Sequence, residues 1–538
     1  DPPTPMNPPA AAPTWGPVVR RNAADTLQAT LNANGSLRHL FSGDLSIKLF
    51  PASELEAGPG NLVLRRHAAD GTCRATPLMG PAAPGRARQR GERRWVEGDW
   101  DGLHYRLELV LADQATAWFW HVELFNASLH HERVDLLLLQ DLALAPWGAV
   151  RLNEAYVSHY IDHHPLAHPA HGTLIASRQN QPVDGRAPWL LSGCLGFGVG
   201  WATDARQLWP AHAAGTAEAS ALGADLPSAR WQHEHSLVAL QGERFVLASG
   251  ARTQRGFFGW LQADHPAASG PDDLSVVDQV MALPEARWTP PPSVADDGGE
   301  AGNRFASAPR FAAREARADA HELHAWYPGP WRHVEADAQG VLRSFFAGAD
   351  THVVTQAKAG AVLRPHGHLL RSGTHWTPDE RALTSTVWMA GVFHSALTQG
   401  HASANRLLSN QRGHLGFQRA QGLRLFVDAG EGWQLLHQPS AFSMTPQACT
   451  WHYRSEHAHI VVHTEAALLA PEVHLALEVL QGPPVKVLAV HHVALDNDDG
   501  LAEGAVHWQP FDGGLSLWPS PDSETALRTT GDNERFRA

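Results

Sequence analysis

The chain has 538 residues, 43% of them hydrophobic and 18% charged, which is enough apolar material for large packed cores. Its formal net charge is −13, and its one arginine-rich segment, 86–94, is short. This charge argues against nucleic acid as a partner, because nucleic-acid-binding proteins present a basic stripe. No run approaches 18 uninterrupted apolar residues, so we expect no membrane-spanning helix.

The amino-terminal residues 1–20 are rich in proline and alanine and lack the basic start and apolar core of a secretion signal. We expect them to form a disordered leader. The three cysteines, Cys73, Cys194 and Cys449, are odd in number and far apart, so they predict neither a disulfide framework nor a zinc site. This usage favours a reducing compartment, and we expect a cytoplasmic protein.

Strand signals dominate the rest of the chain. Apolar and polar residues alternate over 105–111 and 118–125, and residues 134–144 form an apolar run that we interpret as a buried strand. Clusters of Gly, Pro, Asn and Asp separate the segments, as is typical of short strands joined by turns. Further predicted strands lie at 45–50, 195–201, 245–247, 351–355, 422–427, 459–464, 473–480 and 485–493.

One pattern, G-x-L-R-x-x-F-x-G, occurs at 35–43 and again at 340–348, an offset of 305 residues. Solenoid and propeller repeats have periods of roughly 20–50 residues. An offset this long instead predicts two tandem copies of one large β domain. The expected fold class is therefore all-β, with two large β-sandwich domains in tandem.

A helical pattern separates the two predicted domains. Ala312, Ala316, Ala320 and Leu323 recur at helical spacing, which predicts a helix over 307–326 with Ser307 as its N-cap. Residues 289–292 before it are proline-rich. We therefore expect a first β domain at 21–290, a linker with a helix at 291–325 and a second β domain at 326–538.

Several longer motifs resemble one known family. They lie at 153–163, 174–181 and 188–194 in the first half, and at 329–335, 364–373, 391–395, 405–409 and 439–442 in the second. The chain from about residue 22 to its end is similar to the amino-terminal region of the long inverting glycoside phosphorylases of glycoside hydrolase family 94. Among these it most resembles the 1,2-β-oligoglucan phosphorylases.

The resemblance implies β-sandwich domains of the supersandwich, galactose-mutarotase-like type. In that bacterial family these domains precede an (α/α)6 barrel that bears the general acid and the phosphate-binding residues. The sequence contains no run of paired amphipathic helices, so we expect a non-catalytic scaffold and carry over no catalytic residue. The implied reaction of the complete enzyme is phosphorolysis of a β-1,2-glucoside to α-glucose 1-phosphate, with phosphate as co-substrate and no other cofactor. The implied partners are a β-gluco-oligosaccharide, a barrel-bearing catalytic segment or subunit, and a second copy in a homodimer.

Two groups of residues are candidates for sugar contact. The run Arg178, Gln179, Asn180 and Gln181 offers donors and acceptors suited to hydroxyl groups, although such side chains can equally satisfy loop backbone. Among 20 tryptophans, Trp189 and Trp376 lie beside predicted turns and could stack on sugar rings, whereas we expect most of the others in cores.

The second half carries another polar group, Arg364, His366, His368 and Arg371, which we expect at a substrate or interdomain contact. Its H-x-H pattern, and the cluster of His163, His164, His168 and His171, also raise the question of a metal. No third ligand at a suitable spacing is evident, so we expect no metal site.

Two alternatives to the scaffold remain open. One is a stand-alone carbohydrate-binding protein, which would bind oligosaccharide by itself. The other is a mutarotase-like sugar enzyme, for which His394 and Glu380 are the candidate acid and base.

Overall fold

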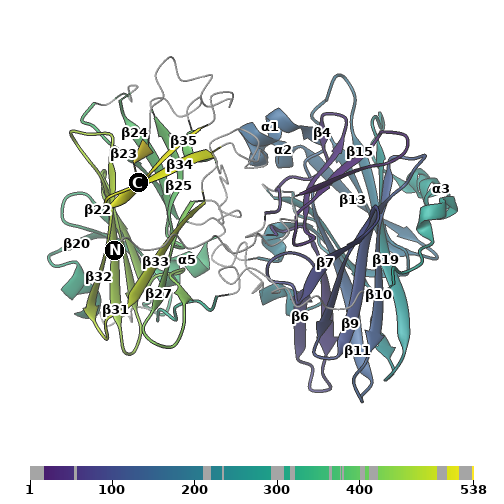
Figure 1. The fold of residues 1–538 in the computed structure, drawn as a ribbon, viewed down its shortest axis with the longest axis horizontal. Helices are drawn as coiled ribbons and strands as arrows, with labels where there is room; N and C mark the ends of the chain where they lie inside the picture. Colours follow the sequence, from purple (N-terminus) through teal and green to yellow (C-terminus); the bar gives the residue numbers. More distant parts are fainter. Residues whose placement is uncertain are drawn as a thin grey trace, which may run out of the picture.

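The computed structural model describes residues 17–53, 57–209, 220–232, 235–292, 308–314, 321–362, 366–375, 377, 381–399, 406–410, 422–492, 506–519 and 536–537. These residues are mostly strands, and they form two separate β bodies, one from each half of the chain (Figure 1). The all-β prediction with two tandem sandwiches is confirmed. None of the described helices is long and apolar enough to cross a bilayer.

The first sandwich packs a five-stranded sheet, sheet 1, against a 14-stranded sheet, sheet 2. Sheet 1 runs in the order β1 (Val18–Arg21), β2 (Gln28–Leu31), β3 (Leu37–Ser42), β4 (Leu45–Ser46) and β12 (Ala145–Pro146). Sheet 2 runs in the order β6 (Cys73–Pro77), β5 (Asn61–His67), β11 (Glu132–Asp141), β17 (Ser236–Gly242), β16 (Gly198–Asp204), β14 (Gly172–Gln179), β15 (Trp189–Cys194), β19 (Arg252–Gln262), β10 (Ala117–Asn126), β9 (Leu103–Leu111), β8 (Arg93–Trp100) and β7 (Gly85–Arg90), with β13 (Ile161–His168) on β14 and β18 (Phe245–Leu247) on β11.

Short helices cover the outer face of sheet 2, which explains why its central strands are apolar on both faces. On β11, Leu136 and Leu138 face the core between the sheets, whereas Leu137 and Leu139 pack in a second core. That second core lies under α1 (Trp147–Leu152), α2 (Glu154–His159) and the 3-10 turns Ala205–Gln207 and Ser220–Gly223. A third core lies under α3 (Ser275–Ala282), between the 3-10 turns Pro271–Leu274 and Pro284–Ala286. Coverage of both faces accounts for the largely apolar run that predicted 134–144 as buried, which is interrupted by Asp135, Gln140 and Asp141.

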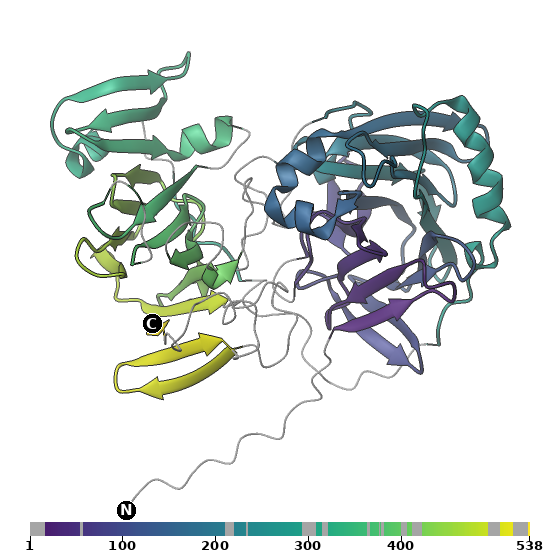
Figure 2. The ribbon, with the colours of Figure 1, turned by 90° about the horizontal axis from the view of Figure 1, so that it is seen from above.

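The second sandwich packs two seven-stranded sheets around one core. Sheet 3 runs in the order β20 (Trp331–Ala336), β21 (Leu342–Ala347), β22 (Thr351–Thr355), β29 (Ala441–Met444), β30 (Ala448–Arg454), β31 (His459–Ala466) and β32 (Val473–Gln481). Sheet 4 runs in the order β23 (Gly367–Arg371), β24 (Leu383–Trp388), β25 (Val392–Gln399), β27 (Gly422–Asp428) and β28 (Gln434–Leu435), with β26 (Arg406–Asn410) on β25 and β33 (Lys486–His492) on β27. A small sheet of β34 (Val506–Phe511), β35 (Gly514–Pro519) and β36 (Phe536–Arg537), and the helices α4 (His321–Trp326) and α5 (Gln356–Ala361), complete this half (Figure 2).

The repeated sequence pattern has the same local geometry in both halves. Gly35 and Gly340 have φ of 81° and 79° and end a tight turn, and the strands β3 and β21 follow at once. The closing glycines Gly43 and Gly348 also match, with φ of 61° and 60°. Positive φ is the conformation that glycine adopts without a steric penalty, which accounts for the glycines of the pattern.

The predicted helix at 307–326 is wrong over its described first part. Residues 308–314 are extended, and Arg310 forms a parallel bridge with Leu435 of β28. The Phe311 amide donates to the Leu435 carbonyl at 2.9 Å, and Phe311 packs against the second core. These tertiary contacts outweigh helix propensity, which is a weak preference. Helix forms at His321–Trp326 as α4, and residues 315–320 lie outside the described residues.

Residues 284–292, at the end of the first half, pack on sheet 2, and we call them the strap. The Trp288 ring stacks on His121 at 5.4 Å between centroids, and its Nε1 donates to Glu108 Oε2 at 2.7 Å. Arg93 and Arg106 donate to backbone carbonyls of Thr289 and Pro291. The domain boundary predicted at 290 therefore falls within a segment that packs on the first sandwich. At the other end, the leader predicted to extend to residue 20 already forms β1 from Val18, and residues 1–16 lie outside the described residues.

Candidate carbohydrate-contact surface

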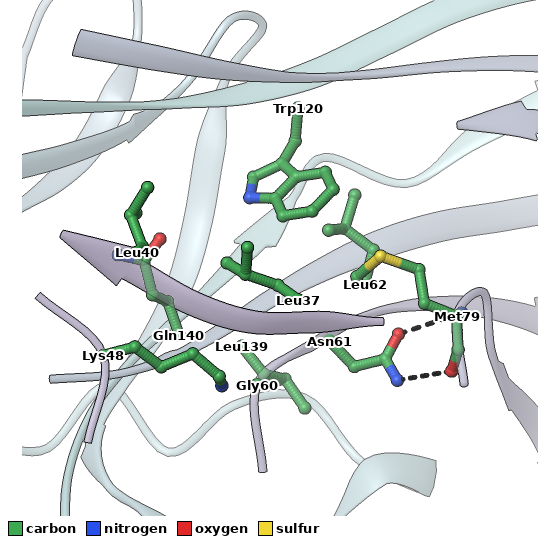
Figure 3. Close-up of a pocket in the computed structure, with 10 residues that line it drawn as sticks. All are labelled: Leu37, Leu40, Lys48, Gly60, Asn61, Leu62, Met79, Trp120, Leu139 and Gln140. Atoms are coloured by element: carbon green, nitrogen blue, oxygen red, sulfur yellow. Dashed lines mark hydrogen bonds between the residues drawn. The ribbon is translucent and has the colours of Figure 1, made fainter. Parts of the chain in front are cut away.

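A small void inside the first sandwich is too small to hold a sugar. This void lies between sheets 1 and 2 and has space for about one water molecule (Figure 3). Its lining is mostly apolar, and the Asn61 side chain is bonded to the backbone of Met79 through both its amide nitrogen and its oxygen. Lys48, also in the lining, is paired with the buried Asp141 at 2.6 Å. We therefore looked for sugar-binding chemistry on the described surface.

Two exposed tyrosines on α2 mark a surface with suitable chemistry. The chain has five tyrosines, and Tyr105, Tyr327 and Tyr453 are buried. The other two, Tyr156 and Tyr160, are 49% and 37% exposed, and their ring centroids lie 5.1 Å apart. Their hydroxyl oxygens are 3.3 Å apart. This pair of exposed rings is a candidate contact surface for the flat face of a sugar.

Local capping determines where these tyrosines lie. The Asn153 side chain caps α2 by accepting from the Tyr156 amide at 3.0 Å, which is a standard N-cap interaction. One helical turn separates Tyr156 from Tyr160, so both rings lie on one side of the helix. Glu154 and Val157 point inward and are buried.

Polar residues from two other segments surround the end of α2. The Asn180 amide donates to the Tyr160 carbonyl at 2.8 Å, which places the end of β14 beside the tyrosines. Gln232 Nε2 donates to the His159 carbonyl at 3.1 Å, and its neighbour Trp231 is 38% exposed. We call Tyr156, Tyr160, Asn180, Trp231 and Gln232 the aromatic surface.

An ion pair lies next to the aromatic surface. Arg230 Nη1 lies 3.5 Å from Asp162 Oδ1 and donates to the His163 carbonyl at 3.3 Å. Flat rings beside amides, a guanidinium and a carboxylate can offer both C–H contact and hydroxyl recognition to a neutral sugar.

The predicted run 178–181 lies at this surface, but two of its members have structural roles. Arg178 donates to the backbone carbonyls of His265 and Pro266 and to Asn180. Gln179 is buried and donates to the carbonyls of Ala143 and Val157. Asn180 is exposed and Gln181 is half-buried, so these two remain the candidates of the run for sugar contact.

Trp189 lies beside a turn, as expected, but it lacks the free face that stacking on a sugar requires. It begins β15, is fully buried, and stacks on His265 at 4.7 Å between ring centroids. Its Nε1 donates to Ser269 Oγ at 2.9 Å. The indole therefore belongs to the core under α3, and we do not carry forward its predicted sugar contact. Trp376 lies outside the described residues.

The described members of the second polar group lie on the second sandwich. His368 Nε2 lies 2.8 Å from the Thr445 carbonyl. Burial, with the nearby charges of His352 and Lys358, lowers the pKa of His366 to about 4. The Arg371 guanidinium donates to the His375 carbonyl. Arg364 lies outside the described residues, so the predicted four-residue group is described only in part.

The histidines considered for metal or acid–base roles are engaged elsewhere. His163 lies between Ser177 Oγ and Ser236 Oγ at 2.8 and 2.9 Å, and burial lowers its pKa to about 3. His394 contacts Ser385 and Thr464, and burial likewise lowers its pKa to about 3. Glu380 lies outside the described residues, and the described part of the chain contains no group of three potential metal ligands.

Comparison with known protein families matches each sandwich. Residues 30–259 match the model described as the SOGP N-terminal domain, and residues 329–525 match the glycoside phosphorylase supersandwich domain. Each half of the chain is thus similar to one of these two domain families. The chain resembles the amino-terminal part of a long glycoside phosphorylase, and the matched ranges cover most of the first and second sandwiches respectively.

A curated relative agrees with the two domain matches. The chain is 28% identical over 502 residues to a 1,2-beta-oligoglucan phosphorylase of Listeria innocua, which covers 92% of this chain and 43% of that protein. The chain therefore spans less than half the length of this phosphorylase.

Solved structures align only loosely. A polysaccharide lyase aligns with a TM-score of 0.30 at 7% identity, covering 86% of this chain and 47% of that one. A galactose mutarotase-like protein from Lactobacillus casei aligns with a TM-score of 0.26 at 8% identity, covering 46% and 100% respectively. Alignments at these scores carry no argument about function.

Proposed function

We propose that this chain is the amino-terminal, carbohydrate-associated scaffold of a glycoside phosphorylase that acts on β-1,2-linked gluco-oligosaccharides. The observation that carries the proposal is the tandem match of both sandwiches to phosphorylase domains in the order first domain, then supersandwich. The relative from Listeria supports the same assignment along nearly the whole chain.

In the complete enzyme, phosphate would attack the glucoside with inversion and release α-glucose 1-phosphate. The reacting groups would come from a barrel-bearing catalytic segment or subunit, and the scaffold would support dimerisation and shape the acceptor side of the cleft. We infer that the enzyme works in the bacterial cytoplasm, where phosphate is available, with no other cofactor.

The aromatic surface is the proposed point of contact with the oligosaccharide. Tyr156 and Tyr160 supply adjacent ring faces, and Asn180 and Gln232 supply amides that can pair with hydroxyl groups. Aromatic rings provide a large apolar contact area that suits the C–H face of a pyranose. The contact would hold the sugar chain while the reaction proceeds elsewhere.

The test is phosphorolysis of oligosaccharides of the sophorose series, measured as release of α-glucose 1-phosphate. We expect no release from the chain alone and release when a barrel-bearing catalytic segment is supplied as a second polypeptide. The double variant Tyr156→Ala/Tyr160→Ala should raise KM about tenfold, the equivalent of about 1.4 kcal/mol, and leave kcat unchanged. Trp508→Ala, at a 65% exposed tryptophan of the second half, is the matched control and should change neither constant.

The same experiment separates the alternatives. Oligosaccharide binding by the chain in calorimetry, with no release of α-glucose 1-phosphate when the catalytic segment is added, would favour a stand-alone carbohydrate-binding protein. Anomerisation or epimerisation without phosphate would favour a mutarotase-like enzyme. If the reconstituted pair releases no α-glucose 1-phosphate, the scaffold proposal fails.

A further inference from the structure

Strand β32 forms one edge of sheet 3, next to β31 (Figure 1). It is nine residues long, and its pairing with β31 is regular from Val473 to Val479. Within the described ranges no strand pairs with its other side. An edge of this kind presents a row of backbone donors and acceptors that can accept another strand.

Other edges of the molecule carry features that block such pairing. β20, at the opposite edge of sheet 3, has two register shifts, and His333 in its middle has a φ of 50°. β7, an edge of sheet 2, carries Arg86, Arg88 and Arg90 in alternation. Bulges and rows of charge are the usual protection of edge strands. β32 contains no Lys, Arg or Pro, so it lacks this protection.

The side chains of β32 are only partly covered. Val473, Leu475, Leu477 and Val479 alternate along the strand and pack against the second core, yet all four remain partly exposed. Leu480 at the end of β32 is 52% exposed, and Leu469 in the loop before it is 97% exposed. This apolar margin extends along the whole edge, which is typical of a surface that another chain covers.

The sequence of β32 is complementary to itself. In an antiparallel pair related by a two-fold axis through Ala476, Val473 lies opposite Val479 and Leu475 lies opposite Leu477. On the other face, His474 of each copy lies opposite Glu478 of the other, an imidazole against a carboxylate.

Other antiparallel registers between the two copies of β32 give less favourable cross-strand pairs. Only shifts that keep each side chain on its own face are allowed, so the axis must pass through a residue position. With the axis at Leu475, Glu472 would face Glu478 of the other copy. With the axis at Leu477, Glu478 would face Ala476 and His474 would face Leu480.

We propose that β32 is a dimerisation edge, at which a second copy of this chain pairs antiparallel about Ala476 and joins the two copies of sheet 3 into one continuous sheet. Leu480 then lies opposite Glu472 of the second copy, beside the loop that bears its exposed leucines. Such an isologous contact closes after two copies, because each edge is used once. The proposal gives the dimer of the proposed function a specific surface, and it does not depend on phosphorolysis.

The test is the mass of the chain in solution, measured by light scattering and by sedimentation over a range of concentrations. We expect about twice the 58.4 kDa of one chain. His474→Glu places two carboxylates opposite each other at both symmetry-related positions and should weaken dimerisation by at least about tenfold. Glu478→His should weaken it less, because it removes the imidazole–carboxylate contact without placing two carboxylates together. Both side chains are exposed, and the His474 imidazole contacts the exposed Glu472 carboxylate at 3.2 Å, so the fold of each copy should change little.

The decisive result comes from mixing the two single variants and from exchanging the two residues within one chain. An equimolar mixture of the two single variants should dimerise, because each carboxylate then faces an imidazole of the other variant. The double variant His474→Glu/Glu478→His should dimerise like the wild type. His457→Glu, on a turn where the side chain is 91% exposed, is the control and should not change the mass.

A monomeric wild type, a dimer indifferent to His474→Glu, or single variants that fail to associate when mixed would each overturn the proposal. A monomer would leave the phosphorolysis test of the scaffold intact, so the two proposals can fail separately.

Discussion

The buried ion pair between Arg65 on β5 and Asp135 on β11 allows a sharp test of how the first sandwich is held together. Both side chains are 0% exposed, and the guanidinium donates to the two carboxylate oxygens at 2.7 and 2.6 Å. His67 and Arg244 approach the same carboxylate at 3.1 and 3.9 Å. Asp135→Asn would leave the buried Arg65 charge with only the exposed carboxylate of Asp225, 3.7 Å away, in place of its buried counterion.

Removing one partner of a buried pair typically costs about 3–5 kcal/mol, because the remaining charge cannot return to water. That is a large share of the roughly 5–15 kcal/mol by which a domain is stable. The double variant Arg65→Met/Asp135→Leu should recover most of the loss, since it removes both charges from the interior. The matched control is Asp101→Asn in the exposed pair Arg74–Asp101, with side chains 62% and 59% exposed, where we expect little or no change.

The measurement has to isolate the first sandwich, because a chain with two sandwiches need not unfold in one step. Native-state hydrogen exchange of the β5 and β11 amides gives the free energy of opening at the pair itself. Guanidinium denaturation of the whole chain would accompany it. The reasoning would be refuted if Asp135→Asn destabilised these strands no more than Asp101→Asn.

Three further predictions concern the turns, the thiols and the response to acid. Gly35→Ala should lower the thermal stability more than Gly340→Ala. Both glycines have positive φ, but only at Gly35 would the new methyl group lie 2.3 Å from Val96. Equal losses of stability in the two variants would contradict this. Of the three thiols, Cys73 should react first with a thiol reagent in native buffer, because Cys194 and Cys449 are buried. Burial also raises the pKa of the Cys194 thiol to about 12, which keeps it in the unreactive protonated form. Faster labelling at either buried cysteine would count against the fold. Because burial lowers the pKa of His163 to about 3, its neutral form stabilises the fold above pH 6.5, and this stability is lost as pH falls from about 6.5 towards 3. Over that window His163→Gln should flatten the pH dependence of the unfolding free energy by about 1.4 kcal/mol per pH unit, and an unchanged slope would show that His163 already binds a proton in the native state.

The sequence predicted the features that depend on local rules. Alternation placed β9 and β10 within two residues of their observed ends, and the repeated pattern predicted two tandem β domains. The glycines of the two copies have the same positive φ, which is a local requirement of their turns. Features that depend on distant partners were missed. Residues 308–314 were predicted as helix because nothing in their own sequence announces the bridge from Arg310 to Leu435.

The same distinction applies to the candidate site. Arg178 and Gln179 looked available for sugar, but their partners at His265 and Ala143 lie far away in the sequence. Tyr156 and Tyr160 were within a recognised motif and were not singled out. Their spacing of four on a short helix, in a chain with only five tyrosines, was the signal that could have identified them.

The strap has a consequence for where the first sandwich ends as a folding unit. Because the Trp288 ring bonds to Glu108 and the carbonyls of Thr289 and Pro291 accept from Arg93 and Arg106, these residues belong to the first sandwich. A first sandwich cut at Leu283 would lose all of these contacts, whereas one that runs to Pro292 would keep them.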